Sequence, residues 1–129
     1  MDPNKPEEKM KTSHKMIIMV DADLKMPKGK LAGQVAHAAV SCVIKEILKG
    51  RIIRVAQWLQ TGQKKVVVKP KTTFDIDIIE IGSKTKESNP SIVTIKDLGK
   101  TVFIGPTVTC CAVGLLKNDD ISLDSFKLL

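Results

Sequence analysis

Hydrophobic and polar positions alternate along the chain in blocks that predict strands and helices. Met16 to Val20 is a short, continuous apolar run followed by a polar Asp21, as expected for a strand buried on both faces. A basic turn over residues 25–30 contains a proline and a glycine, and residues 31–48 then have the apolar spacing of a helix. The pattern therefore begins with a strand, a lysine-glycine loop and a long helix.

The rest of the chain continues this alternation. Residues 74–86 are ambiguous, because Asp and Ile alternate there in part as in a strand, but the length of the segment favours a helix. The other expected elements are a short helix over 51–60 and strands over 65–69, 92–95 and 108–116. Alternating strands and helices predict an α/β fold in which helices cover a mostly parallel or mixed sheet.

The composition is that of one globular domain. The chain has 129 residues, of which 43% are hydrophobic and 27% are charged, and this length is typical of a single domain with its own core. Residues 1–14 are rich in Lys, Glu and Pro, and we expect them to form a disordered leader before a domain that spans residues 15–129. His14 is interpreted as a solvated residue of that leader.

The basic residues are concentrated in one segment. The formal net charge is +7, and residues 51–71 contain six bases and no acid, whereas residues 72–129 contain more acids than bases. Lysine predominates, which suits contacts to a phosphate backbone. Aromatic residues, only 3% of the chain, are too few for platforms that stack successive bases. We therefore expect any nucleic-acid partner to be bound through its backbone.

The cysteines and the known short motifs exclude several classes of protein. Cys42, Cys110 and Cys111 lie in apolar runs, without metal-ligand spacing, so we expect free buried thiols in a reducing, cytoplasmic compartment. The Lys28-Gly29-Lys30 segment lacks the distant glycine and the hydroxyl of a Walker A motif. No apolar run approaches the ~20 residues that span a bilayer. We expect no metal, no cofactor and no membrane association.

A polar stripe interrupts the predicted long helix. Lys30, Gln34, His37 and Ser41 are spaced so that they fall on one side of it. Such a stripe is either the solvent face of an amphipathic helix or part of a site. Its position directly after a strand favours a site, because open α/β sheets bind ligands there and helix amides attract anions.

A second polar group follows the strand predicted over residues 92–95. It consists of Asp97-Leu98-Gly99-Lys100-Thr101 and, eight residues later, Thr109. A β-turn with ordinary strand threonines explains the same residues. As chemistry, a carboxylate can orient or deprotonate water, while an ammonium group and polar donors stabilise an oxyanion, and this set is sufficient for ester hydrolysis.

The two polar groups belong to a recognisable pattern. Residues 23–39 read D-L-K-M-P-K-G-K-L-A-G-Q-V-A-H-A-A, and residues 58–69 read W-L-Q-T-G-Q-K-K-V-V-V-K. Residues 97–101 read D-L-G-K-T, residues 109–110 T-C and residues 127–129 K-L-L. In order and spacing, these blocks resemble the peptidyl-tRNA hydrolases of the archaeal and eukaryotic type.

The resemblance implies a single α/β/α domain with a mixed four-stranded sheet covered by helices on both faces. It also implies metal-independent hydrolysis of the ester between a peptide and the 3′ ribose of tRNA, by a protein that is often a homodimer. Carried over position by position, the family's catalytic positions are Lys30, Gln34, His37, Asp97, Thr101 and Thr109. We expect Lys30 to supply positive charge and Asp97 to position or deprotonate water, with the division of roles between them open. Gln34, Thr101 and Thr109 would hold the network, with His37 as a supporting partner.

The basic residues near the site and in the basic segment are the expected tRNA contacts. They are Lys25, Lys28, Arg51, Arg54, Lys64, Lys65, Lys69 and Lys71. The chain departs from the family pattern at Asp21, Pro27, Gly105-Pro106 and Gly114-Leu115, so its handling of substrate can differ. Two other functions stay open: a non-catalytic RNA-binding or ribosome-associated module of the same fold, and a homodimeric interaction protein of the ubiquitin or stress pathways.

Overall fold

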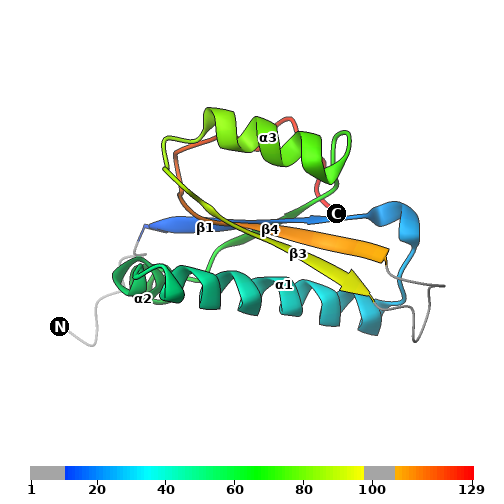
Figure 1. Ribbon diagram of the computed structural model, residues 1–129, viewed down its shortest axis with the longest axis horizontal. Helices are drawn as coiled ribbons and strands as arrows, with labels where there is room; N and C mark the ends of the chain where they lie inside the picture. The colour runs from blue at the N-terminus through cyan, green and yellow to red at the C-terminus, as the bar shows by residue number, and fades with distance from the viewer. Residues whose placement is uncertain (1–10, 98–106) are drawn as a thin grey trace, which may run out of the picture.

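Four strands form one open, mixed sheet in the computed structural model of the protein, which describes residues 11–97 and 107–129 (Figure 1). The strands are β1 (His14–Val20), β2 (Lys65–Val68), β3 (Ser91–Asp97) and β4 (Thr107–Lys117). Their order across the sheet is β2-β1-β4-β3. β2 is parallel to β1, and β4 is antiparallel to both β1 and β3. The mixed four-stranded sheet is thus confirmed.

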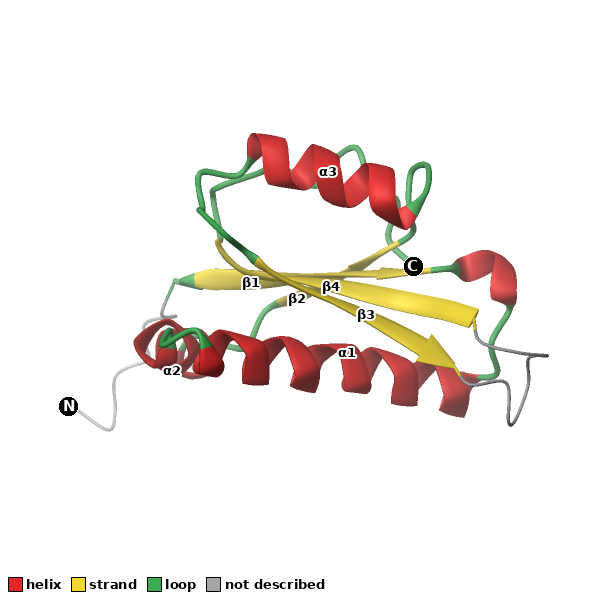
Figure 2. Cartoon of the chain, viewed as in Figure 1, coloured by secondary structure: helices red, strands yellow, loops and turns green. Residues whose placement is uncertain are grey.

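Helices cover both faces of this sheet (Figure 2). α1 (Lys28–Leu48) and α2 (Ile52–Gln60) lie on one face, and α3 (Phe74–Lys84) lies on the other (Figure 1). A short 3-10 helix, η1 (Ala22–Leu24), connects β1 to α1. The ambiguous segment that we predicted as a helix is indeed α3, and it begins where the Thr73 hydroxyl accepts a hydrogen bond from the Ile76 N–H.

β1 supplies both layers of the core because its successive side chains point to opposite faces. Met16, Ile18 and Val20 pack with the core on the α1 and α2 side, which includes Ala38, Cys42, Val55 and Trp58. Ile17 and Met19 pack with the core on the α3 side, which includes Ile81 and Phe126. All seven residues of the strand are buried, which confirms the burial predicted for the apolar run Met16 to Val20 and extends it to His14 and Lys15.

Three boundaries differ from the sequence prediction. β1 begins at His14, which is 8% exposed, so our interpretation of His14 as a solvated leader residue was wrong. α1 begins at Lys28, and residues 28–30 form its first turn instead of a loop, because the Pro27 carbonyl already accepts the Leu31 N–H at 2.9 Å. Asp97 is the last residue of β3, paired with Thr107, whereas the sequence prediction ended this strand at residue 95. These boundaries determine where the side chains of His14, Lys30 and Asp97 lie.

α1 also has the length and apolar composition of a membrane-crossing helix, although the core helices of many other proteins meet the same two criteria. α1 therefore does not meet our expectation that no apolar segment approaches the length needed to span a bilayer. Only 17% of the most apolar window of α1 is buried within the fold. Much of the helix surface away from the sheet is therefore apolar and exposed.

Candidate active site

The N-terminal end of α1 brings the first pair of expected catalytic residues together. Lys30 lies in the first turn of α1, and its Nζ forms an ion pair with Oδ2 of Asp97, at the end of β3. The Asp97 side chain is only 4% exposed, whereas that of Lys30 is 20% exposed. The carboxylate is therefore enclosed by protein, while the ammonium group reaches the surface.

A second pair lies one helical turn further along α1. The Thr109 hydroxyl, buried on β4, donates a hydrogen bond of 2.7 Å to the side-chain Oε1 of Gln34. Lys30 and Gln34 are four residues apart, so they share one side of the helix. Because β3 and β4 are neighbours, the pairs Lys30–Asp97 and Gln34–Thr109 form one polar cluster between the helix and the sheet, which we call the α1 cluster.

The hydrogen bond from Thr109 fixes the orientation of the Gln34 amide. Since Oε1 accepts the hydroxyl proton, the Nε2 group points away from Thr109 with two hydrogens to donate. The backbone N–H of Asp21 also donates a hydrogen bond of 3.0 Å to the backbone carbonyl of Thr109. The α1 cluster therefore combines a carboxylate, an ammonium group and an oriented amide donor, which is a set that is sufficient for ester hydrolysis.

Two other expected catalytic residues do not join this cluster in the described part of the chain. The His37 side chain is exposed on α1, and it makes no hydrogen bond or ion pair with another described residue. Thr101 lies outside the described residues, as do Lys100 and the departure at Gly105-Pro106. The departure at Asp21 does lie beside the cluster, through its bond to Thr109.

One supporting contact was not foreseen from the sequence. The Cys110 thiol donates to the backbone carbonyl of Gln34 at 3.3 Å and so ties α1 to β4. Burial raises the pKa of the Cys110 thiol, which disfavours the thiolate needed for nucleophilic attack. Cys42, Cys110 and Cys111 are all buried and free, as predicted. No sequence signal linked Cys110 to a residue 76 positions earlier in the chain.

The expected tRNA-binding residues divide into three groups: two lysines near the α1 cluster, four lysines around β2, and two arginines at the far end of α1. Lys25 and Lys28 are exposed next to the α1 cluster. Among the basic residues around β2, Lys65 lies over the Trp58 ring at 5.1 Å, Lys64 donates to Asn118 at 2.9 Å, and Lys69 is exposed. Lys71 is held by Glu80 at 2.9 Å.

Arg51 and Arg54 lie at the opposite end of α1 and hold a buried acid. Glu46, which is 0% exposed, accepts a 3.0 Å hydrogen bond from Arg51 Nη1, and its Oε2 lies 3.8 Å from Arg54 Nη1. Arg54 also binds Glu87 at 2.8 Å, and the Leu115 N–H donates to Glu46 Oε1 at 3.1 Å. Since Lys30 and Glu46 are 16 residues apart along α1, this group of ion pairs, which we call the Glu46 cluster, lies roughly 24 Å from Lys30.

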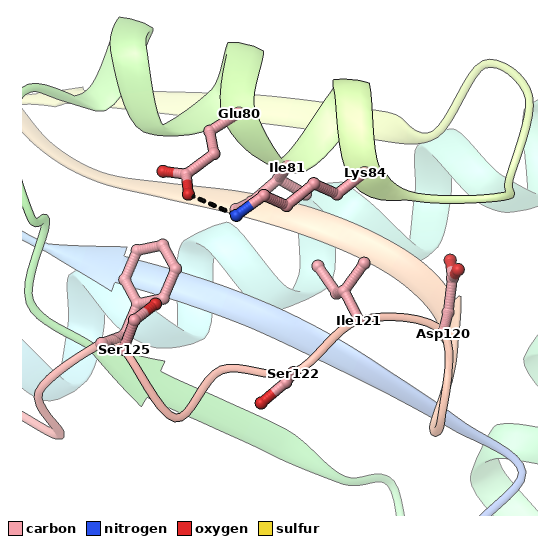
Figure 3. A pocket seen from close by; sticks show the side chains of 8 residues that line it. Glu80, Ile81, Lys84, Asp120, Ile121, Ser122 and Ser125 are labelled. Atoms are coloured by element: carbon pink, nitrogen blue, oxygen red, sulfur yellow. Dashed lines mark hydrogen bonds and ion pairs between the residues drawn. The ribbon is translucent and has the colours of Figure 1, made fainter.

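A separate cavity of about 270 Å³ lies on the other face of the sheet, between α3 and the C-terminal segment (Figure 3). On the α3 side of the cavity, Lys84 donates to Glu80 at 2.7 Å, and together with Lys71 it lowers the pKa of Glu80 to about 2. These charges already neutralise one another. The cavity contains none of the residues of the α1 cluster and lies across the sheet from it.

Comparison with known proteins identifies the family of the chain. Residues 14–129 match the family described as "Peptidyl-tRNA hydrolase PTH2". A protein named peptidyl-tRNA hydrolase from Thermoplasma volcanium is 41% identical over 121 residues, which cover 89% of this chain and 97% of the relative. Proteins of the same name from Saccharolobus islandicus and Saccharolobus solfataricus are 44% and 39% identical, each over 78% of this chain and 84% of the relative. The chain belongs to the PTH2 family of peptidyl-tRNA hydrolases.

Proposed function

We propose that the α1 cluster is the centre at which this enzyme hydrolyses the ester bond of peptidyl-tRNA, and so releases the peptide and recycles the tRNA. The observation that carries the proposal is the ion pair between Lys30 and the enclosed carboxylate of Asp97. It places a base and a positive charge at one point of the surface, next to the oriented amide of Gln34.

In the proposed mechanism, Asp97 takes a proton from a water molecule whose oxygen attacks the ester carbonyl carbon. Negative charge then develops on the carbonyl oxygen, which Lys30 and the Nε2 group of Gln34 stabilise. The bond to the ribose oxygen breaks, and the proton held by Asp97 passes to that oxygen. Thr109 acts through Gln34, and Thr101 and the exposed His37 are proposed to support the network on the substrate side.

We propose that the tRNA backbone is bound mainly by the lysines near the α1 cluster and around β2. Lys25, Lys28, Lys64, Lys65 and Lys69 are exposed there, and Lys71 extends the group. Arg51 and Arg54 make a smaller contribution in this proposal, because their guanidinium groups already bind acids and carbonyls. Reversing the charge of Lys64 and Lys65 should raise KM and spare kcat, as expected for contacts that position the substrate.

The test of the catalytic assignment is turnover of diacetyl-lysyl-tRNA by Lys30→Ala and Asp97→Ala variants. Each substitution removes a group that acts in the transition state, so we expect kcat to fall by about 10²–10⁴-fold. Lys84→Ala is the matched control, since it removes a lysine from an exposed ion pair on the other face of the sheet. Cleavage by both variants at the wild-type rate would refute the assignment, and tRNA binding without cleavage by the wild type would favour the non-catalytic alternative.

A homodimer is the proposed assembly, and the outer face of α1 and α2 is its proposed interface. Large apolar side chains are exposed along this face: Val40, Ile44, Ile47, Leu48, Ile52 and Ile53, from 42% exposed at Ile47 to 82% at Leu48. Exposed apolar patches of this kind are typical of interaction sites. Light scattering should give twice the chain mass for the wild type and the single-chain mass for Ile44→Asp with Ile53→Asp. We propose that the protein works in the cytoplasm.

A further inference from the structure

A groove of about 560 Å³ runs along α1 on the side that faces β2. Its floor is apolar and consists of small and medium side chains: Leu31, Val35, Ala36 and Ala39 of α1, Val67 of β2, and Leu129. Lys28 and Lys65, the first residues of α1 and β2, also line it. Among the described residues that line the groove, none is acidic.

The groove is continuous with the α1 cluster. Lys28, in the groove, and Lys30, in the ion pair with Asp97, both lie in the first turn of α1. From residue 28 the groove follows the helix to residue 39, over roughly 16 Å. A chain lying in it would therefore reach the α1 cluster by passing the N-terminal end of the helix.

The charges around the groove fit an anionic chain. Lys28 and Lys65 contribute two positive charges, and the first turn of α1 adds the positive end of the helix dipole. That turn contains no acidic residue, and its N-cap, Pro27, gives it no side-chain hydrogen bond. Phosphate groups are therefore favoured along the edge of the groove, while its apolar floor suits the faces of ribose and base.

We propose that this groove binds the unpaired nucleotides that precede the 3′ ribose of the tRNA, so that the single strand passes from the lysines of β2 to the ester at Asp97. The inference rests on the proposed function of the α1 cluster. The peptide is the alternative occupant, but its side chains vary from substrate to substrate, whereas two fixed lysines match phosphates that every substrate carries. The peptide then leaves on the other side of α1.

The experiment places a charge in the floor of the groove. Ala36 is exposed on α1, so Ala36→Glu and Ala36→Lys introduce opposite charges without disturbing the core. With diacetyl-lysyl-tRNA, Ala36→Glu should raise KM by about threefold to tenfold and leave kcat unchanged, while Ala36→Lys should not raise KM. Gln60→Glu, on the exposed part of α2, adds the same negative charge away from the groove and should not change KM.

Varying the amino acid on the tRNA distinguishes the single strand of the tRNA from the peptide as the occupant of the groove. The ratio of KM values between Ala36→Glu and wild type should stay constant when the same tRNA carries acetylated glycine, aspartate or lysine. A ratio that follows the charge of the amino acid would assign the groove to the peptide and overturn the proposal, as would equal KM values for Ala36→Glu and Gln60→Glu.

Binding of a trinucleotide tests the proposed role of the groove independently of catalysis. The trinucleotide cytidine-cytidine-adenosine should shift the amide NMR signals of Leu31, Val35 and Ala36 in the wild type, and bind more weakly to Ala36→Glu. If the wild type releases no peptide from tRNA, the proposed function fails, and this measurement alone then decides whether the groove binds RNA. Signals that do not move on addition of the trinucleotide would refute the proposal.

Discussion

The two ends of α1 each hold a carboxylate beside basic side chains, yet they are built differently. At the N-terminal end, Asp97 forms an ion pair with Lys30, whose side chain reaches the surface. At the C-terminal end, Glu46 is 0% exposed and is contacted by Arg51, Arg54 and the Leu115 N–H. The first acid is connected to the surface through the partly exposed ammonium group of Lys30, whereas the second is fully enclosed by protein groups.

This difference distinguishes an ion-pair cluster that stabilises the fold from an ion pair that we propose acts in catalysis. The Arg51 guanidinium also donates to the Asn89 carbonyl at 2.8 Å, and Arg54 also binds Glu87, so the Glu46 cluster joins α1 to the segment before β3. A lysine is a compact donor with one mobile charge, which can turn from Asp97 towards a developing oxyanion. The arginines at the C-terminal end stabilise the fold, and we propose that the lysine at the N-terminal end acts on the substrate.

Glu46→Ala should give the largest effect on stability. It leaves the charges of two arginines and a backbone N–H without their buried partner, a change that costs about 3–5 kcal/mol in comparable buried pairs. Chemical denaturation measures the free energy of unfolding, and kcat for peptidyl-tRNA should stay at the wild-type value in the folded fraction. Glu80→Ala, which breaks the exposed ion pairs of Glu80 with Lys71 and Lys84, is the control and should cost far less than Glu46→Ala. A loss at Glu46 as small as that of the control would contradict the comparison.

Thr109→Val tests whether Thr109, near the N-terminal end of α1, positions the Gln34 amide or binds the substrate directly. The substitution keeps the shape of the side chain but removes the hydroxyl that orients the Gln34 amide. We expect kcat to fall about tenfold, which corresponds to the loss of one hydrogen bond, with KM unchanged. Thr109→Ser should restore most of the activity. Thr94→Val, at an exposed position on β3, should leave kcat unaltered, and a rise in KM at Thr109→Val would indicate direct substrate binding instead.

The smallest expected effect is the pH dependence of stability caused by His14, near the C-terminal end of α1. Burial, with the nearby Arg54 charge, lowers the pKa of His14 below its ordinary value of 6.5. The unfolded chain therefore binds more protons than the folded protein at acidic pH, and the free energy of unfolding should decline as pH falls from about 6.5. His14→Gln should flatten this part of the stability curve measured between pH 5 and 8. An identical slope in the variant would exclude His14 as the titrating group.

Most of the fold could be predicted because its signals are local. The apolar run of β1 and the Asn-Pro turn before β3 depend on neighbouring residues, and so does the cap at Thr73. The start of α1 was placed three residues late, because lysine and glycine are typical of loops and Pro27 was interpreted as a breaker. Proline is in fact well tolerated at the beginning of a helix, where its missing N–H has no partner to lose.

The contacts of the candidate site could be predicted only in part. Residue types and the family pattern identified Lys30, Asp97, Gln34 and Thr109, and the structure brings these four together. The pairing itself depends on strand register, which places β3 and β4 side by side and is not visible in the sequence. The role of Arg51 and Arg54 was missed for a related reason: a count of charges does not show that a buried glutamate already binds them.

β1 has a further consequence for how this protein can change in evolution. Its even-numbered residues face α1 and its odd-numbered residues face α3, so inserting or deleting one residue would exchange the two sets between different surroundings. Methionine and isoleucine would fit either side by volume, but Asp21 and Thr109 would lose their backbone pairing. Length variation among descendants of this sequence should therefore be confined to loops, because a change of length in β1 would also shift β4 and Thr109 relative to the proposed catalytic carboxylate of Asp97.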